Sequence, residues 1–403
     1  MNEDLLELKR ESIINSKIKD AVISCIDFAY NYANSYDLGI CLAATFDLMV
    51  SAAYYKSVAN RGWTYCCEEP QMMFYTYTNI CPRCIGNDKF VFAKANKPES
   101  GRIGQITTEL LCVFYQHIFM RNGHNVEVFK ASEPIDVIVR DVEKNIFILA
   151  EVKAAPLLTI PLAVKCDTLT ENIDGVLAYT EHETVDNPFL HRSNMGLYLP
   201  SYNSQSDQFY GLDINWEDES CYFDAILKLI QKDSSFFTSY LDFWYTAYKS
   251  YKDKTKTVSL YWLTNACGGP VPIPSNWPKR RGTGYESISD SKTSAGMDRT
   301  DDIKKGIYQV LKLGAEYKTT HPNIKTAIIS NLPALRHFNE YLLTLKDVVW
   351  AISPEKFTTS LSDLPPETPI YNLFDGIISL TQSEIRDPWI KEILSQKNVQ
   401  SYR

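Results

Sequence analysis

The 403-residue sequence lacks the motifs that identify several common classes of enzyme. It has no GxxxxGK[ST] phosphate-binding loop, so the chain does not encode ATP-driven translocation. It also has no HNH-like array and no HExxH pair of the kind that binds a catalytic zinc ion. No low-complexity tract or internal repeat is present, and the composition, 45% hydrophobic and 12% aromatic, is that of a globular protein. The sequence is therefore long enough for two domains, or for one large domain with insertions.

Targeting segments and long apolar runs are missing as well. Polar or charged residues interrupt the apolar runs well short of the roughly 20 residues that a membrane-spanning helix needs. The N-terminal stretch MNEDLLELKR is charged and has no signal-peptide core. Ten cysteines without a secretory signal predict a reducing compartment, in which they serve as thiols or metal ligands. We expect a cytoplasmic protein.

The sequence also has no excess of positive charge. The formal net charge is −8, which does not point to nucleic-acid binding. It does not exclude it either, because an enzyme that cuts DNA needs a basic cleft rather than a basic average.

The most informative stretch is PIDVIVRDVEKNIFILAEVK, residues 134–153. Two runs rich in Ile and Val, residues 135–141 and 146–154, predict two strands joined by a polar turn. Both strands carry acids within apolar surroundings. Because side chains alternate along a strand, the register of this hairpin decides whether those acids meet on one face.

Three registers are open. A loop of Glu143 and Lys144 puts Asp136 directly opposite Glu151, whereas a loop of Lys144 and Asn145 puts Asp136 opposite Lys153. In both cases Asp136, Glu151 and Lys153 project from one face. A three-residue loop would place Asp136 on the other face, and no site would assemble.

Two carboxylates and an ammonium group at the end of one hairpin suit a specific chemistry. Neighbouring carboxylates repel each other, so a cation normally lies between them. Mg²⁺ prefers oxygen ligands and is usually bound by one or two carboxylates together with substrate phosphate. Such an ion can activate a water molecule and neutralise charge on phosphoryl oxygens, while a lysine stabilises the developing charge. The pattern predicts a phosphodiesterase site.

At these residues the chain resembles the PD-(D/E)xK nuclease superfamily, in particular type II restriction endonucleases. The Pro-Asp of the family appears as Pro134-Ile135-Asp136, with one residue inserted, and its ExK is Glu151-Val152-Lys153. The resemblance implies Asp136 and Glu151 as Mg²⁺ ligands and Lys153 as the catalytic lysine. It also implies an α/β (α+β) fold, a restriction-endonuclease-like mixed sheet flanked by helices in the order αβββαβ.

The resemblance extends to the flanking helices. Residues 98–124 predict a helix that precedes the hairpin, and helices in that position often contribute an acid, which makes Glu109 a candidate. A helix is also predicted from Asp301, followed by a buried strand at residues 323–333. Some members of the superfamily use a glutamine on this helix, which makes Gln309 a candidate. The resemblance covers about residues 98–155 and 300–332.

A second motif is Cys81-Pro82-Arg83-Cys84, a CPxC turn that aims two thiolates at one point, as structural zinc requires. Cys66 and Cys67 lie fourteen and thirteen residues before Cys81 and are the nearest further ligands. Adjacent cysteines are an unusual pair, so one of them could bind while the fourth ligand comes from Cys25, Cys41 or a histidine. We predict a structural Zn²⁺ in a zinc-ribbon-like subdomain.

The most basic loop lies within residues 266–300, where Gly and Pro density forbids regular structure. Mobile basic loops suit phosphate contact and entry into a DNA groove, where Arg can read guanine. The residues that we expect to contact DNA are Lys279, Arg280, Arg281, Lys292, Arg299 and Lys304.

These signals divide the chain as follows: a helical N-terminal region at 1–62, a zinc-ribbon-like DNA-contacting subdomain at 63–97, a nuclease core at 98–166 and 256–350, a helical and aromatic insertion at 167–255, and a C-terminal extension at 351–403. Within the core, residues 258–266 are predicted to form a strand.

The resulting hypothesis is a Mg²⁺-dependent, sequence-specific endonuclease that cuts double-stranded DNA, as type II restriction enzymes do. That class implies a homodimer on two-fold symmetric DNA, a prokaryotic cytoplasm, and a cognate DNA methyltransferase as a genetic partner. The alternatives are a repair or junction nuclease on the same core, or a non-catalytic zinc-containing DNA-binding protein.

Overall fold

The computed structural model describes residues 2–33, 36–58, 64–65, 72–78, 80–89, 91, 100–165, 194–200, 208–265, 294–352 and 360–395. The chain divides into two compact units. The first comprises Met1–Ile13, Leu111–Ala154 and Gly296–Arg403, and the second comprises Ile14–Leu110 and Ala155–Ala295. Each unit has its own sheet and its own core.

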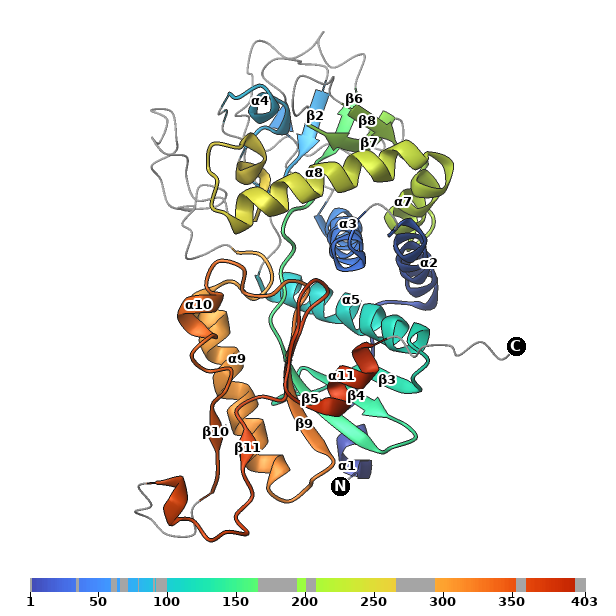
Figure 1. The fold of residues 1–403 in the computed structure, drawn as a ribbon. Coiled ribbons are helices and arrows are strands. Elements are labelled where there is room, and N and C mark those ends of the chain that lie inside the picture. Colours follow the sequence, from blue (N-terminus) through green and yellow to red (C-terminus); the bar gives the residue numbers. More distant parts are fainter. Residues whose placement is uncertain are drawn as a thin grey trace, which may run out of the picture. The chain divides into compact units, whose positions relative to one another are not determined.

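A six-stranded mixed sheet forms the centre of the first unit (Figure 1). Its strands, in spatial order, are β13 (Glu384–Ile385), β12 (Gly376–Ile378), β9 (Ile324–Ile329), β5 (Ile146–Val152), β4 (Val137–Asp141) and β3 (Val126–Lys130). β3, β4 and β5 are an antiparallel meander, whereas β5, β9 and β12 run parallel to one another. The carboxyl ends of these three parallel strands therefore lie at one edge of the sheet.

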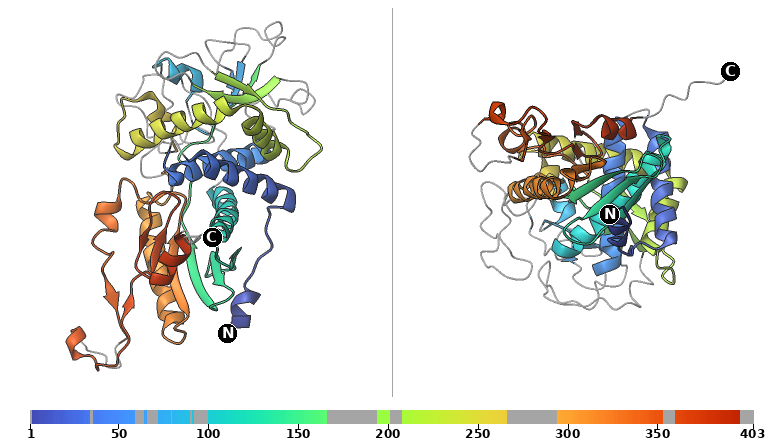
Figure 2. Two further views of the ribbon diagram at one scale, coloured as in Figure 1. Left: turned by 45° about the vertical axis from the view of Figure 1, so that its right-hand side comes forward. Right: turned by 90° about the horizontal axis from the view of Figure 1, so that it is seen from below.

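Helices lie on both faces of this sheet (Figures 1 and 2). One face is covered by α9 (Thr300–Leu313) and α1 (Asn2–Glu7), and the other by α11 (Pro388–Leu394) and the second half of α5 (Ser100–Arg121). α9 is amphipathic, and its Ile303 and Val310 pack on Ile328 of β9, while Leu313 lies in a cluster with Ile324. α9 therefore runs antiparallel to β9, with its first turns over the carboxyl edge.

The mixed α/β class predicted from the sequence is confirmed. Within the first unit the elements follow in the order α5, β3, β4, β5, α9, β9, which is αβββαβ, and residues Ala155–Ala295 of the second unit intervene in the sequence between β5 and α9. The C-terminal residues, expected as an extension, instead contribute to the first unit. β12 and β13 complete its sheet, and β11 (Tyr371–Asn372) pairs with β10 (Val349–Trp350).

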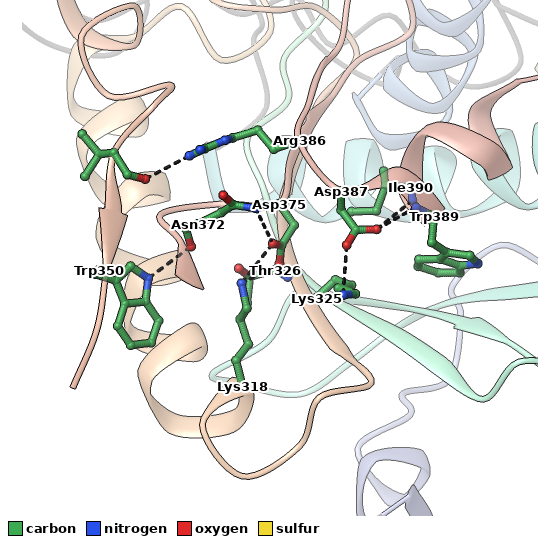
Figure 3. Close-up of polar contacts among 11 residues, drawn as sticks. Lys318, Lys325, Thr326, Trp350, Asn372, Asp375, Arg386, Asp387, Trp389 and Ile390 are labelled. Carbon is green, nitrogen blue, oxygen red and sulfur yellow. Dashed lines mark hydrogen bonds and ion pairs between the residues drawn. The ribbon is translucent and has the colours of Figure 1, made fainter. Parts of the chain in front are cut away.

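A buried ion pair attaches this C-terminal segment to β9 (Figure 3). α9 continues into a five-residue π-helix, η2 (Gly314–Lys318), which turns Lys318 inward. The Lys318 ammonium lies 3.0 and 2.8 Å from the two carboxylate oxygens of Asp375, and Thr326 N donates to the same carboxylate at 2.8 Å. Both charged side chains are under 10% exposed. Asp375 therefore has several donors, as a buried carboxylate requires.

The second unit combines helices with a five-stranded antiparallel sheet. Besides the first half of α5, the helices are α2 (Ser16–Tyr32), α3 (Leu38–Val58), α4 (Pro82–Gly86), α7 (Cys221–Lys232) and α8 (Ser234–Lys252). The strands, in spatial order, are β1 (Thr64–Tyr65), β2 (Met72–Tyr75), β6 (Leu162–Lys165), β7 (Asn194–Leu199) and β8 (Gln208–Gly211). β2 pairs with β6 across a large sequence separation. The described part of residues 63–97 therefore belongs to a larger sheet and not to a separate subdomain.

α3 is the central helix of the second unit. By length and composition Leu38–Lys56 could cross a membrane, but 83% of this stretch is buried inside the protein, as in the core helix of a soluble protein. Its Asp47 is fully buried, and one carboxylate oxygen accepts from Trp244 Nε1 at 2.7 Å and from the backbone N of Leu157 and Leu158 at 2.9 and 3.2 Å. Burial raises the pKa of Asp47 to about 8, against the effect of these three donors. α3 thereby fixes the chain that follows Ala154.

The strand predicted at residues 258–266 is wrong. Residues Ser259–Leu263 form a short 3-10 helix, η1, in the second unit. Leu260, Tyr261, Trp262 and Leu263 are all buried. A continuous apolar run of this length is compatible with a strand or with a buried helical turn, and periodicity alone does not distinguish them.

Candidate active site

The predicted hairpin forms, and its register brings the acids together. Val137 pairs with Ala150, so Asp136 lies opposite Glu151, which is the first of the registers considered above. Asp136 N donates to Ala150 O at 3.2 Å, which continues the pairing beyond the strand. Asp136, Glu151 and Lys153 consequently lie at the carboxyl edge of β5, on the face that α9 covers.

The turn of the hairpin explains why this register is chosen. Asp141 ends β4, and its side chain accepts hydrogen bonds from the backbone N of Glu143 and Lys144 at 3.0 and 2.8 Å. Asn145 adopts a positive φ of 51°, a conformation that Asn tolerates better than most residues. Local hydrogen bonding of an aspartate therefore fixes the turn. This turn fixes which residues face each other five residues further along the hairpin, about 17 Å away at about 3.4 Å per residue.

The three side chains interact directly. Lys153 Nζ donates to Glu151 Oε1, and both side chains are largely buried, 17% and 13% exposed. Asp136 Oδ2 accepts from Val152 N at 2.8 Å, which holds its carboxylate against β5. Burial and the nearby Asp136 carboxylate raise the pKa of Glu151 to about 7, although the ammonium group of Lys153 opposes this shift. The site thus concentrates more negative charge than its one lysine compensates.

α9 packs over this cluster and helps to position its residues. Gly306 is the point at which α9 comes close to the cluster. A Cβ atom at this position would lie 3.1 Å from Ile328 Cδ1, which is a tight contact, and 3.8 Å from Lys153 Cγ. The stem of Lys153 therefore passes directly under the helix. Three residues later, the Gln309 side-chain amide donates to the carbonyl oxygen of Pro134, two residues before Asp136. Gln309 thus supports the segment directly before β4, which carries Asp136.

Gly306 was not identified from the sequence. A glycine in the interior of an exposed helix costs about 1 kcal/mol relative to alanine. A glycine within the helical stretch KKGIYQVLKL therefore indicates that α9 closely approaches another element at this position.

The remaining predicted residues are not all brought to this cluster. Glu109 is a buried residue of α5 in the part of the helix that belongs to the second unit, and its role stays a prediction. Arg299 is half-buried at the residue before α9. Lys304 is exposed on α9, with Nζ 5.4 Å from the centre of the Tyr341 ring. The predictions for Lys279, Arg280, Arg281 and Lys292 lie outside the described residues.

The CPxC motif lies at α4 in the second unit. Cys81 immediately precedes this helix and Cys84 is inside it, and both are buried beside Met72 and Phe74. Cys66 and Cys67 lie outside the described residues. Across the described ranges no three His, Cys, Asp or Glu side chains are grouped so that they could hold a metal ion. A structural zinc site needs four ligands, and the described residues bring together only Cys81 and Cys84, so the zinc site stays a prediction.

Comparisons with known proteins yield no relative. No family model matches the chain, and neither the curated proteins nor the solved structures contain a significant match to it. We therefore infer the function from the site itself.

Proposed function

We propose that this chain is a Mg²⁺-dependent endonuclease that hydrolyses phosphodiester bonds in double-stranded DNA, and that it cuts at specific sequences as type II restriction enzymes do. The observation that carries the proposal is the pairing of Asp136 with Glu151 across β4 and β5, with Lys153 on the same face. The αβββαβ order of the surrounding elements supports it, because the restriction-endonuclease-like core has that order.

The donor set suits Mg²⁺. Asp136 and Glu151 offer carboxylate oxygens only, which are the ligands this ion prefers, and two protein carboxylates leave positions for water and for substrate phosphate. The raised pKa of Glu151, caused by burial and by Asp136, indicates an arrangement of acids that a cation would stabilise. In this proposal Asp136 and Glu151 hold Mg²⁺, which supplies Lewis acidity toward the phosphoryl oxygens and lowers the pKa of an attacking water molecule.

The protein residues have separate roles in this reaction. Lys153 stabilises the negative charge that develops on the phosphoryl group, and in the resting enzyme its bond to Glu151 holds its ammonium group at the site. Gln309 fixes the backbone before Asp136, so it positions that carboxylate without touching substrate. Glu109 and the predicted DNA contacts, including Arg299 and Lys304, complete the hypothesis as residues for mutagenesis.

Structural zinc is the second cofactor that we propose. Cys81 and Cys84 flank the first turn of α4 and are within one apolar cluster. Cys66 and Cys67 are the candidates for the remaining ligands. Metal analysis of the purified full-length protein tests this directly. About one zinc per chain in the wild type, lost in Cys81→Ser and Cys84→Ser, supports the proposal, and a zinc-free folded wild type overturns it.

The class of enzyme implies a setting. We propose a homodimer, since a two-fold protein matches a palindromic DNA site, and a prokaryotic cytoplasm in which a cognate DNA methyltransferase protects the host genome.

The first experiment is digestion of plasmid and phage DNA by the purified protein, with Mg²⁺ and with EDTA. Discrete fragments that appear only with Mg²⁺ support a site-specific endonuclease and allow its recognition sequence to be mapped. Cleavage restricted to branched or damaged substrates would favour a repair or junction nuclease instead. Tight DNA binding without cleavage of any substrate would favour the non-catalytic alternative and overturn the enzymatic proposal.

A further inference from the structure

The outer surface of α9 carries a segment of positive charge beside the candidate active site. Between Lys304 and Leu313 the helix contains three lysines and no acid. Lys305 and Lys312 are exposed, and the Tyr308 side chain between them is 66% exposed, the most exposed of the large apolar and aromatic residues in the described part of the chain. Solvent-facing lysines are ordinary on helices, but an aromatic ring left this exposed between them suggests a surface that contacts a partner.

The position of this surface follows from the packing of α9. Residues three or four apart share a helix face, so Lys305, Tyr308 and Lys312 form one continuous strip. Lys305 is one turn before Gln309, whose side chain donates to Pro134 O beside Asp136. Gly306, the next residue after Lys305, lies against the stem of Lys153. Since α9 runs antiparallel to β9, its earlier turns are nearest the carboxyl edge where Asp136 and Glu151 lie.

Lys304 belongs to a different part of the helix surface. Its ammonium group lies over the ring of Tyr341, next to α10 (Phe338–Tyr341). Desolvation, then Glu340 and to a smaller extent Asp301, raise the pKa of Tyr341, so acids are close to that ring. The strip of Lys305, Tyr308 and Lys312 lies on the solvent-exposed surface of α9, next to the flank that carries Gln309. No acid lies between its members, and exposed acids lie one turn beyond each end, at Asp301 and Glu316.

We propose that this strip of α9 is the track for the sugar–phosphate backbone of duplex DNA next to the phosphate that is cut. The inference rests on the proposed nuclease function and assigns it a substrate-positioning surface. Lys305 and Lys312 are seven residues apart, about 10 Å along a helix axis at 1.5 Å per residue, a span of about three phosphates of one DNA strand at roughly 3.4 Å of duplex axis each. The Tyr308 hydroxyl provides a neutral hydrogen-bond donor to the same backbone.

Binding of a fluorescent 40-base-pair duplex of mixed sequence, measured by anisotropy in EDTA over a series of salt concentrations, tests the proposal. The variant is Lys305→Glu combined with Lys312→Glu in the full chain. Its control is Lys391→Glu, an exposed lysine of α11 on the opposite face of the same sheet. Loss of two phosphate contacts predicts an affinity at least about 10-fold lower and a salt slope reduced by about 2. Tyr308→Phe is expected to lower affinity by less than about 5-fold.

The outcomes separate this inference from the proposed function. If the wild type cuts DNA with Mg²⁺ and the double variant binds and cuts as Lys391→Glu does, the strip is not the track, and the nuclease proposal stands. If the double variant loses affinity and slope as predicted but the wild type never cuts, the strip binds DNA and the nuclease proposal fails. A wild type that neither binds nor cuts duplex DNA overturns both. Urea denaturation of each variant checks that the exposed substitutions leave the fold intact.

Discussion

Two lysine–carboxylate pairs lie at the sheet of the first unit. They differ in burial and in the donors and charges that surround the carboxylate. Lys318 and Asp375 are under 10% exposed, and the carboxylate accepts from the lysine through both oxygens and from Thr326 N (Figure 3). Lys153 and Glu151 are more exposed, at the carboxyl edge, and a second carboxylate, Asp136, lies opposite. The first pair has all its partners, whereas the second has an excess of negative charge.

The difference indicates how a structural ion pair can be told from a functional one. A buried carboxylate that is surrounded by donors contributes to a unique packing of the chain, and removing its partner leaves an uncompensated charge. A carboxylate whose pKa is raised by burial and by a like charge, at the carboxyl edge of a sheet, is a candidate for metal binding or catalysis. Substitutions at the two pairs should therefore have opposite effects on stability and activity.

The largest effect is expected for Lys153→Met. Loss of the charge that stabilises the transition state should lower the rate of DNA cleavage at least about 10³-fold, or about 4 kcal/mol, while the free energy of unfolding changes by less than about 1 kcal/mol. The matched control is Lys144→Met in the turn of the same hairpin, whose exposed ion pair with Glu392 is worth little. Single-turnover cleavage and urea denaturation measure the two quantities. A Lys153→Met enzyme that cuts normally would remove the distinction between the pairs.

Lys318→Met should show the reverse pattern. It leaves Asp375 buried without its counter-ion, so we expect the free energy of unfolding to fall by about 3 kcal/mol. At a temperature where the variant stays folded, its cleavage rate should remain within about threefold of the wild type. Replacing both partners, as Lys318→Met with Asp375→Leu, should recover part of the lost stability, because an apolar pair of similar volume leaves no charge uncompensated. Equal loss in the single and double variants would contradict that explanation.

Asp47 of the second unit extends the comparison to pH. Burial raises its pKa to about 8 in the folded protein, and in the unfolded chain it titrates near pH 4. Between these values unfolding releases a proton, so stability should fall as pH rises, by up to about 1.4 kcal/mol per pH unit. Asp47→Asn should flatten this dependence, while Asp213→Asn, at a side chain 91% exposed, should not. Urea denaturation between pH 5 and 8 gives the slopes; equal slopes in wild type and Asp47→Asn would show that Asp47 is ionised when folded.

The smallest effect is expected for Gln309→Ala. Its amide makes one hydrogen bond, to Pro134 O, and a bond of this kind contributes about 1 kcal/mol. We expect cleavage to slow by about 5-fold to 10-fold through a lower turnover rate, with little change in DNA affinity. Lower affinity with unchanged turnover would mean that Gln309 contacts DNA and does not position Asp136.

The sequence predicted the local features of the first unit well. Alternation of apolar residues and the polar turn were enough to define the hairpin, and the resemblance to PD-(D/E)xK nucleases supplied the αβββαβ order. The register was left open, because it depends on the hydrogen bonds of Asp141 to the turn and on the positive φ of Asn145. The alternative registers differ only in the position or length of a short loop, and the amino-acid composition of the turn does not distinguish them.

Long-range organisation was not predictable from local patterns. The segment that leaves the first unit after Ala154 belongs with Ile14–Leu110 in the second unit, so the insertion is larger than the predicted residues 167–255. Pairing of β2 with β6 and the contacts of Asp47 with Leu157 and Leu158 join segments about 90 to 110 residues apart. Nothing in either segment alone specifies its partner. The same reason explains why the C-terminal strands β12 and β13 were expected outside the core.

The central claim is that Asp136 and Glu151 form a Mg²⁺-dependent site for phosphodiester hydrolysis. The most direct measurement is the Mg²⁺ dependence of plasmid cleavage by the wild type, by Glu151→Gln, and by Glu143→Gln, which removes an exposed acid from the turn of the same hairpin. The account predicts that the wild type and Glu143→Gln cut with Mg²⁺ and not with EDTA, and that Glu151→Gln binds DNA without cutting it. Cleavage by Glu151→Gln at the wild-type rate and at the same Mg²⁺ concentration would contradict the account.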